Sequence, residues 1–207
     1  MCPRRRGVGF LLAPVLVFTG AVSAWAGPPT DQLRASIDQV IRILEDPDLR
    51  KDARTAERRV AVRQIANETF DFTEITRRCL GTHWQGRTPD ERDEITRLFT
   101  DLLERSYIGK LESYSGERVI YLGDTVADDA ASVRTRLVTK QGTEIPVEYR
   151  MHRRDGRWLV YDVSIEGVSL VANYRAQFNK TIRTVSYAGL LERLRAKQDE
   201  ARTASPR

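Results

Sequence analysis

Apolar positions in the first half of the chain recur at the spacing of amphipathic helices. A first helix is predicted after the N-cap residue Thr30, with apolar residues three or four positions apart: Leu33, Ile37, Val40, Ile41 and Leu44. A second helix is predicted over 53–67, and a short third helix that ends at Gly81. The fourth begins at Thr88, where Glu91 completes the pattern of a capping box.

From Gly116 onward the apolar period changes from helical to alternating. Four strands are predicted, over 117–122, 131–140, 144–154 and 157–166. Their short connections, including the tight turn Asp155-Gly156, predict an antiparallel meander. Two more helices are predicted after Gly167, the last over 187–198. The predicted fold class is α+β, a twisted four-stranded antiparallel sheet with helices packed on it.

The N-terminal segment changes the meaning of the overall charge. The 207 residues carry a formal net charge of +5, which by itself favours a nucleic-acid partner. Three arginines precede an apolar run over 8–22, and Ala24-Trp25-Ala26 follows it, the layout of a secretory signal peptide. We expect residues 1–26 to be cleaved, an uncleaved membrane anchor being the alternative. The remaining chain carries about +2, so a nucleic-acid partner is not expected.

The exported part of the chain is expected to form one domain over 27–198, followed by a flexible polar tail over 199–207. No Gly/Ser-rich linker divides it, and Cys79 is its single cysteine, so no internal disulfide is expected. The basic stretch 50–63 has acids interspersed. It is either a solvated helix face or a docking surface for an acidic partner or an anionic membrane.

Residues with catalytic or metal-binding potential are few. Cys79 and His83 lie four positions apart, but the intervening Gly81 is expected to break the helix, so we expect Cys79 to be a buried structural residue. His152 lies among arginines on the polar face of a strand, and we expect it to be solvated.

Two carboxylates also lie four positions apart on the last predicted strand. Asp162 and Glu166 fit a paired-carboxylate site, or alternatively ion pairing and backbone capping near Arg175. Large aromatic side chains from helices and strands are predicted to face one interior: Tyr107, Tyr114, Tyr149, Trp158, Tyr174 and Phe178. They form either a solid core or the wall of a ligand cavity.

Three segments of the chain carry a family resemblance. They are Phe70-Asp71-Phe72 with Arg78-Cys79-Leu80-Gly81, Trp84 and Thr88-Pro89; Leu102-Leu103 with Tyr107 and Tyr114; and 145–151 followed by 156–178. With these residues the chain resembles the MlaC / toluene-tolerance family of periplasmic phospholipid-binding proteins. The resemblance covers nearly all of the exported chain. Cys79 departs from the family pattern, in which a small residue is more common.

The resemblance implies both a fold and a function. The implied fold encloses a deep apolar pocket for acyl chains, with the phospholipid head group near its mouth. The implied function is that of a soluble, monomeric periplasmic carrier of Gram-negative bacteria. Its partners are an outer-membrane lipoprotein–porin complex and an inner-membrane ABC transporter with an MCE-domain subunit, and its role is to maintain outer-membrane lipid asymmetry. Such a protein is not an enzyme and uses no cofactor.

The predicted pocket wall combines this resemblance with the alternation along the strands. It consists of Leu103, Tyr107, Leu111, Val133, Leu137, Val147, Tyr149, Met151, Trp158, Val160, Val168, Tyr174 and Phe178. Arg175 is the candidate for a phosphate contact. Three alternatives stay open: a carrier of another lipid such as a hopanoid, a small periplasmic enzyme that uses Asp162 and Glu166, and a scaffold protein with a solid core.

Overall fold

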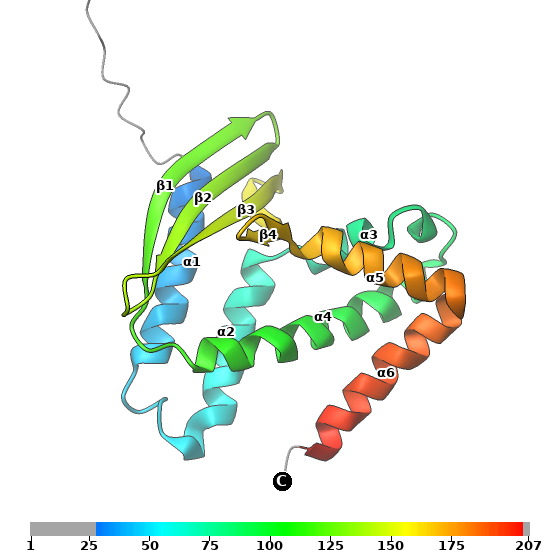
Figure 1. The fold of residues 1–207 in the computed structure, drawn as a ribbon, viewed down its shortest axis with the longest axis horizontal. Helices are drawn as coiled ribbons and strands as arrows, with labels where there is room; N and C mark the ends of the chain where they lie inside the picture. The colour runs from blue at the N-terminus through cyan, green and yellow to red at the C-terminus, as the bar shows by residue number, and fades with distance from the viewer. Residues whose placement is uncertain (1–27, 205–207) are drawn as a thin grey trace, which may run out of the picture.

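The chain folds into an antiparallel sheet flanked by helices, as seen in the computed structural model (Figure 1), which describes residues 28–204. The expected signal peptide, 1–26, lies outside the described residues. The helices before the sheet are α1 (Pro28–Glu45), α2 (Thr55–Thr69), α3 (Phe72–Leu80) and α4 (Pro89–Glu112). Short 3-10 turns, η1 (Asp52–Arg54) and η2 (Gly81–Trp84), precede α2 and follow α3.

The sheet has five strands in the order β1-β2-β3-β4-β5, and the prediction of four is wrong. The strands are β1 (Arg118–Ala127), β2 (Ala130–Val138), β3 (Glu144–Arg154), β4 (Arg157–Ile165) and β5 (Val168–Ser169). The fifth strand has two residues, too few for an alternating pattern to reveal it. The first strand continues past its predicted end, because an irregularity between Tyr121 and Gly123 shifts the register and interrupts the alternation.

Two helices follow the sheet, α5 (Leu170–Thr184) and α6 (Tyr187–Ala204). The last helix continues beyond 198, where the pattern of apolar residues ends. In Figure 1 the sheet and α1 occupy one side of the molecule, α3, α5 and α6 the other, and α4 runs from one side to the other. Among the helices between residues 28 and 204, none is both long and apolar enough to cross a bilayer.

The helix termini in the first half follow from local side-chain chemistry. The capping box of α4 is confirmed: the Glu91 N–H donates to Thr88 Oγ1 at 3.2 Å, and the Thr88 N–H donates to Glu91 Oε2 at 2.8 Å. Helix α3 is capped by Asp71, whose Oδ1 accepts the Glu74 N–H at 2.9 Å. It ends, as predicted, at Gly81, whose φ of 56° favours a residue without a side chain.

Thr30 is not the N-cap that the sequence predicts, because α1 already begins at Pro28. Its N–H and its Oγ1 both donate to Asp124 Oδ2 on β1, at 3.0 and 2.8 Å. Thr30 is fully buried, so these bonds satisfy its polar groups and fix α1 on the sheet. Nearby, the Gln32 side chain bonds to both the N–H and the carbonyl of Trp158 and occupies part of the edge of β4.

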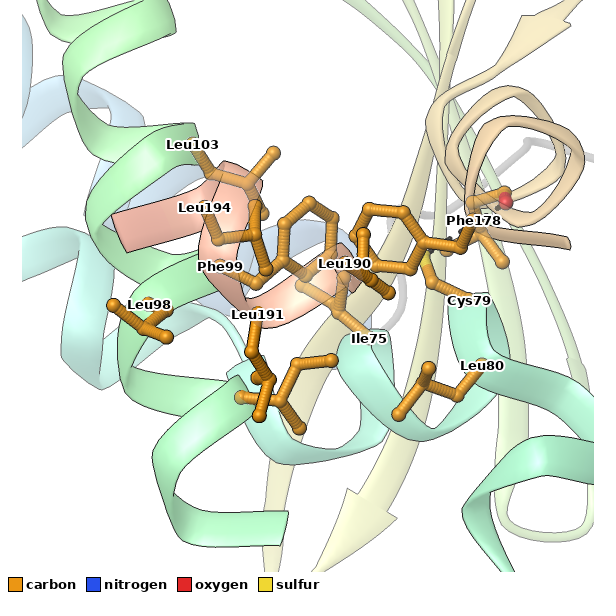
Figure 2. Close-up of a cluster of buried hydrophobic side chains, with 12 residues drawn as sticks. Ile75, Cys79, Leu80, Leu98, Phe99, Leu103, Phe178, Leu190, Leu191 and Leu194 are labelled. Atoms are coloured by element: carbon orange, nitrogen blue, oxygen red, sulfur yellow. Dashed lines mark hydrogen bonds between the residues drawn. The ribbon is translucent and has the colours of Figure 1, made fainter. Parts of the chain in front are cut away.

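The buried apolar side chains form two separate clusters. The helical cluster is built by α3, α4, α5 and α6, and in Figure 2 its side chains converge between these helices. Its members are Ile75, Cys79, Leu80, Ile95, Leu98, Phe99, Leu103, Val171, Phe178, Leu190, Leu191 and Leu194. The sheet cluster lies between α1 and the sheet: Leu33, Ala131, Val133, Met151, Trp158 and Val160. Helix α2 packs on α1, α4 and β4, and thereby bridges the two regions.

Candidate functional site

One row of cross-strand partners opens progressively toward the edge of the sheet. Thr135 on β2 pairs with Val147 on β3, Val147 with Ile165 on β4, and Ile165 with Val168 on β5. Cross-strand partners point to the same face of a sheet, so the four side chains form one continuous row. Thr135 is 2% exposed, Val147 is half-buried, Ile165 is 44% exposed and Val168 is 66% exposed. The apolar face of the sheet therefore reaches solvent at the β4–β5 edge.

The other end of the same face is closed. Val133, Met151 and Val160 have no exposed surface, and Trp158 is 7% exposed. All four pack with Leu33 of α1 in the sheet cluster. These four predicted wall residues therefore lie in a packed core.

Half-buried apolar side chains lie between these two ends. Leu137, Val147 and Tyr149 keep part of their surface accessible on the sheet. Burial nevertheless raises the pKa of Tyr149 to about 12, because the surrounding protein disfavours the phenolate.

The helical side contributes a second aromatic surface. Tyr107 of α4 and Tyr174 of α5 are half-buried and pack on the helical cluster, and burial raises the pKa of both phenols. The ring of Phe99 contacts the rings of Tyr174 and Phe178 edge-on, each at 4.8 Å between centroids.

The remaining predicted wall residues of the helices and of the sheet edge differ widely in exposure. Leu103 and Phe178 are 5% and 4% exposed within the helical cluster. Leu111, at the end of α4, is 39% exposed, and Val168, at the sheet edge, lies mostly in solvent. The predicted wall thus spans two cores, a half-buried middle and an exposed rim.

Arg175, the candidate phosphate contact, lies exposed on α5. Its Nε donates to the main-chain carbonyl of Arg78 on α3 at 2.7 Å. This bond holds the guanidinium against the α3–α5 contact, and it leaves the two Nη groups to other acceptors.

Asp162 caps the start of α5. Its Oδ1 accepts the Val171 N–H at 3.0 Å, and its Oδ2 accepts the Ser169 hydroxyl at 2.6 Å. Asp162 is 3% exposed, whereas Glu166 lies exposed in the following turn with φ 51°. Asp162 thus has the predicted capping role, and it also lies 3.9 Å from Arg150 Nη1 through its Oδ2.

Cys79 is buried, as the sequence predicts, at 1% exposure. Its Sγ lies 3.8 Å from the carbonyl oxygen of Val171, and burial raises the pKa of its thiol to about 12. His83 lies in η2, and its Nε2 is 2.8 Å from Asn179 Oδ1. The residues that the structure describes contain no cluster of three or more His, Cys, Asp and Glu that could hold a metal ion.

His152 is only partly solvated, whereas the sequence predicts a solvated side chain. Its Nε2 lies 3.2 Å from Asp71 Oδ2, and its ring contacts Tyr161 edge-on at 5.8 Å between centroids. Arg154 also donates to Asp71 Oδ2, at 3.2 Å. The carboxylate that caps α3 therefore also connects this helix to β3, a contact between distant segments that no local pattern signals.

The basic stretch 50–63 is largely neutralised within the fold. Arg58 and Arg59 both bond to Glu112 at the end of α4, and Arg63 Nε lies 2.9 Å from Glu104 Oε2. Arg54, at the end of η1, pairs with Glu57 of α2. The bonds to Glu112 and Glu104 fix α2 on α4, while most residues of the stretch remain exposed.

Two pockets are found elsewhere on the described surface. The first has a volume of 340 Å³ and lies beside the start of α3 and the β3–β4 hairpin, where Phe70, Phe72, Leu159, Arg154 and Arg157 line it. The second, of 310 Å³, lies between α1 and α2. Neither is lined by a residue of the predicted pocket wall.

The apolar face of this antiparallel sheet is thus closed at one end, half-buried in the middle and open at its edge. The chain belongs to the MlaC family: the model of that family, described as MlaC protein, matches residues 34–196.

Two known proteins are similar to this chain. The "Intermembrane phospholipid transport system binding protein MlaC" of Haemophilus influenzae is 24% identical over 102 residues, which cover 45% of this chain and 46% of that protein. The matched region thus spans about half the length of this curated relative. The phospholipid-binding protein from Ralstonia solanacearum, solved in complex with a phospholipid, is 27% identical with a TM-score of 0.73. That match covers 84% of this chain and 98% of the other.

Proposed function

We propose that this protein is a phospholipid carrier. The acyl chains of the bound phospholipid lie against the half-buried middle of the sheet face. The observation that carries this proposal is the match to nearly the whole of a protein solved with a phospholipid. Tyr149, Val147 and Tyr107 border the acyl chains in this proposal, and the exposed Val168 lies at the mouth. No catalytic step is part of this function.

The energetics of lipid transfer explain why a carrier is needed. A two-chain phospholipid has on the order of 30 CH₂ groups, and burying each contributes about 0.8 kcal/mol, so roughly 24 kcal/mol opposes its entry into water. A carrier needs to bind the phospholipid about as strongly as the membrane does, and no more strongly, because both bury the acyl chains. The wall therefore requires apolar contact and few polar contacts, which agrees with a surface of Val, Leu and Tyr side chains.

We further propose that the protein works in the periplasm after export by the segment 1–26. It would receive phospholipid from one membrane complex and deliver it to another: an outer-membrane lipoprotein–porin complex and an inner-membrane ABC transporter with an MCE-domain subunit. The name of the Haemophilus influenzae relative, an intermembrane phospholipid transport binding protein, supports this assignment. Such transfer would maintain outer-membrane lipid asymmetry.

Arg175 is the proposed phosphate contact. Its Nε is bound to the Arg78 carbonyl, and its Nη groups would contact the phosphate. A phosphate contact by a single cation predicts weak discrimination between head groups. Replacing Arg175 with Gln should lower the amount of retained phospholipid only modestly.

The proposal is tested by what copurifies with the protein. Protein purified from cells under mild conditions is extracted with organic solvent, and the extract is analysed by mass spectrometry. We expect about one phospholipid per protein chain. Recovery of no lipid would refute the proposal, and recovery of a hopanoid in its place would retain the fold but change the cargo.

A further inference from the structure

Helices α3 and α5 form a surface with an excess of positive charge. The 15 residues of α5 include Arg175, Lys180 and Arg183 and no acid. Helix α3 carries Arg77 and Arg78 against the single acid Glu74. The two helices pack against each other and together hold four more cations than acids, whereas residues 28–204 as a whole hold only one more. The α3–α5 surface therefore carries a local excess of positive charge. Segment 50–63 has an equal excess, but three of its arginines pair with Glu104 and Glu112 of α4.

Two of the three cations of α5, Lys180 and Arg183, lie away from its buried side. Val171 and Phe178 point into the helical cluster, and Lys180 and Arg183 are exposed and form no ion pair with any residue that the structure describes. Other exposed positions of α5 hold small or neutral polar residues: Ala172, Asn173, Ala176, Gln177 and Asn179. The outer side of α5 therefore offers positive charge without competing carboxylates.

An exposed apolar edge directly precedes this helix. Ile165 and Val168 are cross-strand partners at the β4–β5 edge, and α5 begins two residues after Val168. Their exposures of 44% and 66% leave apolar surface in water at the N-terminal end of the positive helix. The exposed Glu166 lies in the turn between them, and Lys180 and Arg183 lie further along α5. Exposed aliphatic side chains next to lysines and arginines are typical of surfaces that bind an anionic membrane.

We propose that the outer side of α5 and the β4–β5 edge dock on an anionic phospholipid bilayer. Lys180 and Arg183 would lie against the lipid phosphates, and Ile165 and Val168 would enter the interface. This inference rests on the proposed carrier function, because the row of side chains that begins at this edge leads inward to Val147 and the acyl-chain wall. Docking by this surface would present the mouth of the carrier to the membrane.

A bilayer fits this surface better than an acidic protein does. The large apolar side chains exposed here are aliphatic, and none of the strongly exposed apolar residues in the described chain is a Trp, Tyr or Phe. Protein interfaces are enriched in aromatic anchors and depleted in lysine. Separated cations with an aliphatic edge suit a fluid, negatively charged surface that needs no shape complementarity.

The test is co-sedimentation of the purified protein with vesicles at low salt. We expect binding to vesicles that contain phosphatidylglycerol, weak binding to pure phosphatidylcholine, and release as salt is raised. The double variant Lys180→Gln, Arg183→Gln should bind anionic vesicles roughly 10- to 30-fold more weakly. The control Arg97→Gln, Arg193→Gln removes the same charge from exposed positions on α4 and α6 and should bind like the wild type.

The apolar edge is tested in the same assay. Val168→Asp should weaken binding to anionic vesicles, and Val126→Asp, at a 48% exposed position of β1, should not. Equal losses in the α5 variant and its control, or no binding by the wild type, would overturn the proposal. Binding to polyglutamate without binding to the vesicles would also overturn it and indicate an acidic protein partner. Lipid that copurifies with the α5 variant reports the carrier function separately, because Lys180 and Arg183 are not part of the acyl-chain wall.

Discussion

The two ends of one sheet face differ in a way that their sequences do not show. Around Met151 the apolar side chains are fully buried under α1, whereas around Val147 they are half-buried and lead to the exposed Val168. Both ends consist of similar aliphatic residues in strict alternation. The difference arises because α1 covers one end through the Thr30–Asp124 bonds, while β4–β5 forms the open edge at the other. One face thus combines a stabilising core with a surface suited to a ligand.

The largest expected effect lies at the closed end. Met151→Ala should lower the free energy of unfolding by about 2–5 kcal/mol, because it removes a fully buried side chain and leaves a cavity. Val147→Ala should cost only about 1 kcal/mol, since its side chain is already half-exposed. Urea unfolding of the delipidated proteins measures both. Equal losses would mean that the two ends are packed alike.

The next effect concerns the junction between the sheet and α5. Asp162→Ala leaves the buried Val171 N–H and the Ser169 hydroxyl without their acceptor, and should destabilise by about 1.5–3 kcal/mol. Asp162→Asn retains one acceptor oxygen and should cost less. Thermal unfolding of the two variants shows which of them loses more stability. A larger loss for Asn than for Ala would contradict the capping role.

The fall of stability at alkaline pH compares a buried group of the helical cluster, Cys79, with one of the sheet wall, Tyr149. Burial raises the pKa of Cys79 from 9.0 to about 12 and that of Tyr149 from 10.0 to about 12. The unfolded chain releases these protons first, so stability should fall as pH rises through the unfolded pKa values, by at most about 1.4 kcal/mol per pH unit for each group. Urea unfolding between pH 8 and 11 measures the slope. In Cys79→Ala the stability should begin to fall at a higher pH than in the wild type. In Tyr149→Phe the fall above pH 10 should be shallower. An unchanged slope in both variants would refute this explanation.

The smallest effect on stability is expected at the half-open wall. Val147→Trp adds bulk to the space beside Tyr149 and should change stability by less than about 1 kcal/mol, whereas overpacking a closed core costs about 1–3 kcal/mol. Its effect on cargo should be much larger, with little phospholipid recovered by extraction. Val126→Trp, at an exposed site of β1, is the matched control and should retain lipid. Unchanged lipid in Val147→Trp would make this residue ordinary core.

Local patterns predicted most elements but not the details that arise from pairing. The helical spacing, the capping box at Thr88 and the helix end at Gly81 were predictable, because each depends on residues within one or two turns. The two-residue strand β5 gave no signal, because it is too short for alternation and forms only by pairing with β4. The His152–Asp71 contact joins residues 81 positions apart, and Thr30–Asp124 joins residues 94 apart, so neither was visible locally.

The sequence by itself determined the α+β class, the apolar alternation of the strands, the burial of Cys79 and the resemblance to the MlaC family. Only the tertiary structure decided which part of the predicted wall is core and which part is open. Val133, Met151, Trp158 and Val160 became core because α1 packs on them, and alternation shows only that one face of a strand is apolar. It likewise decided that the arginines of α2 are mostly neutralised by α4, whereas those of α5 remain exposed, because charge partners are set by which helices meet.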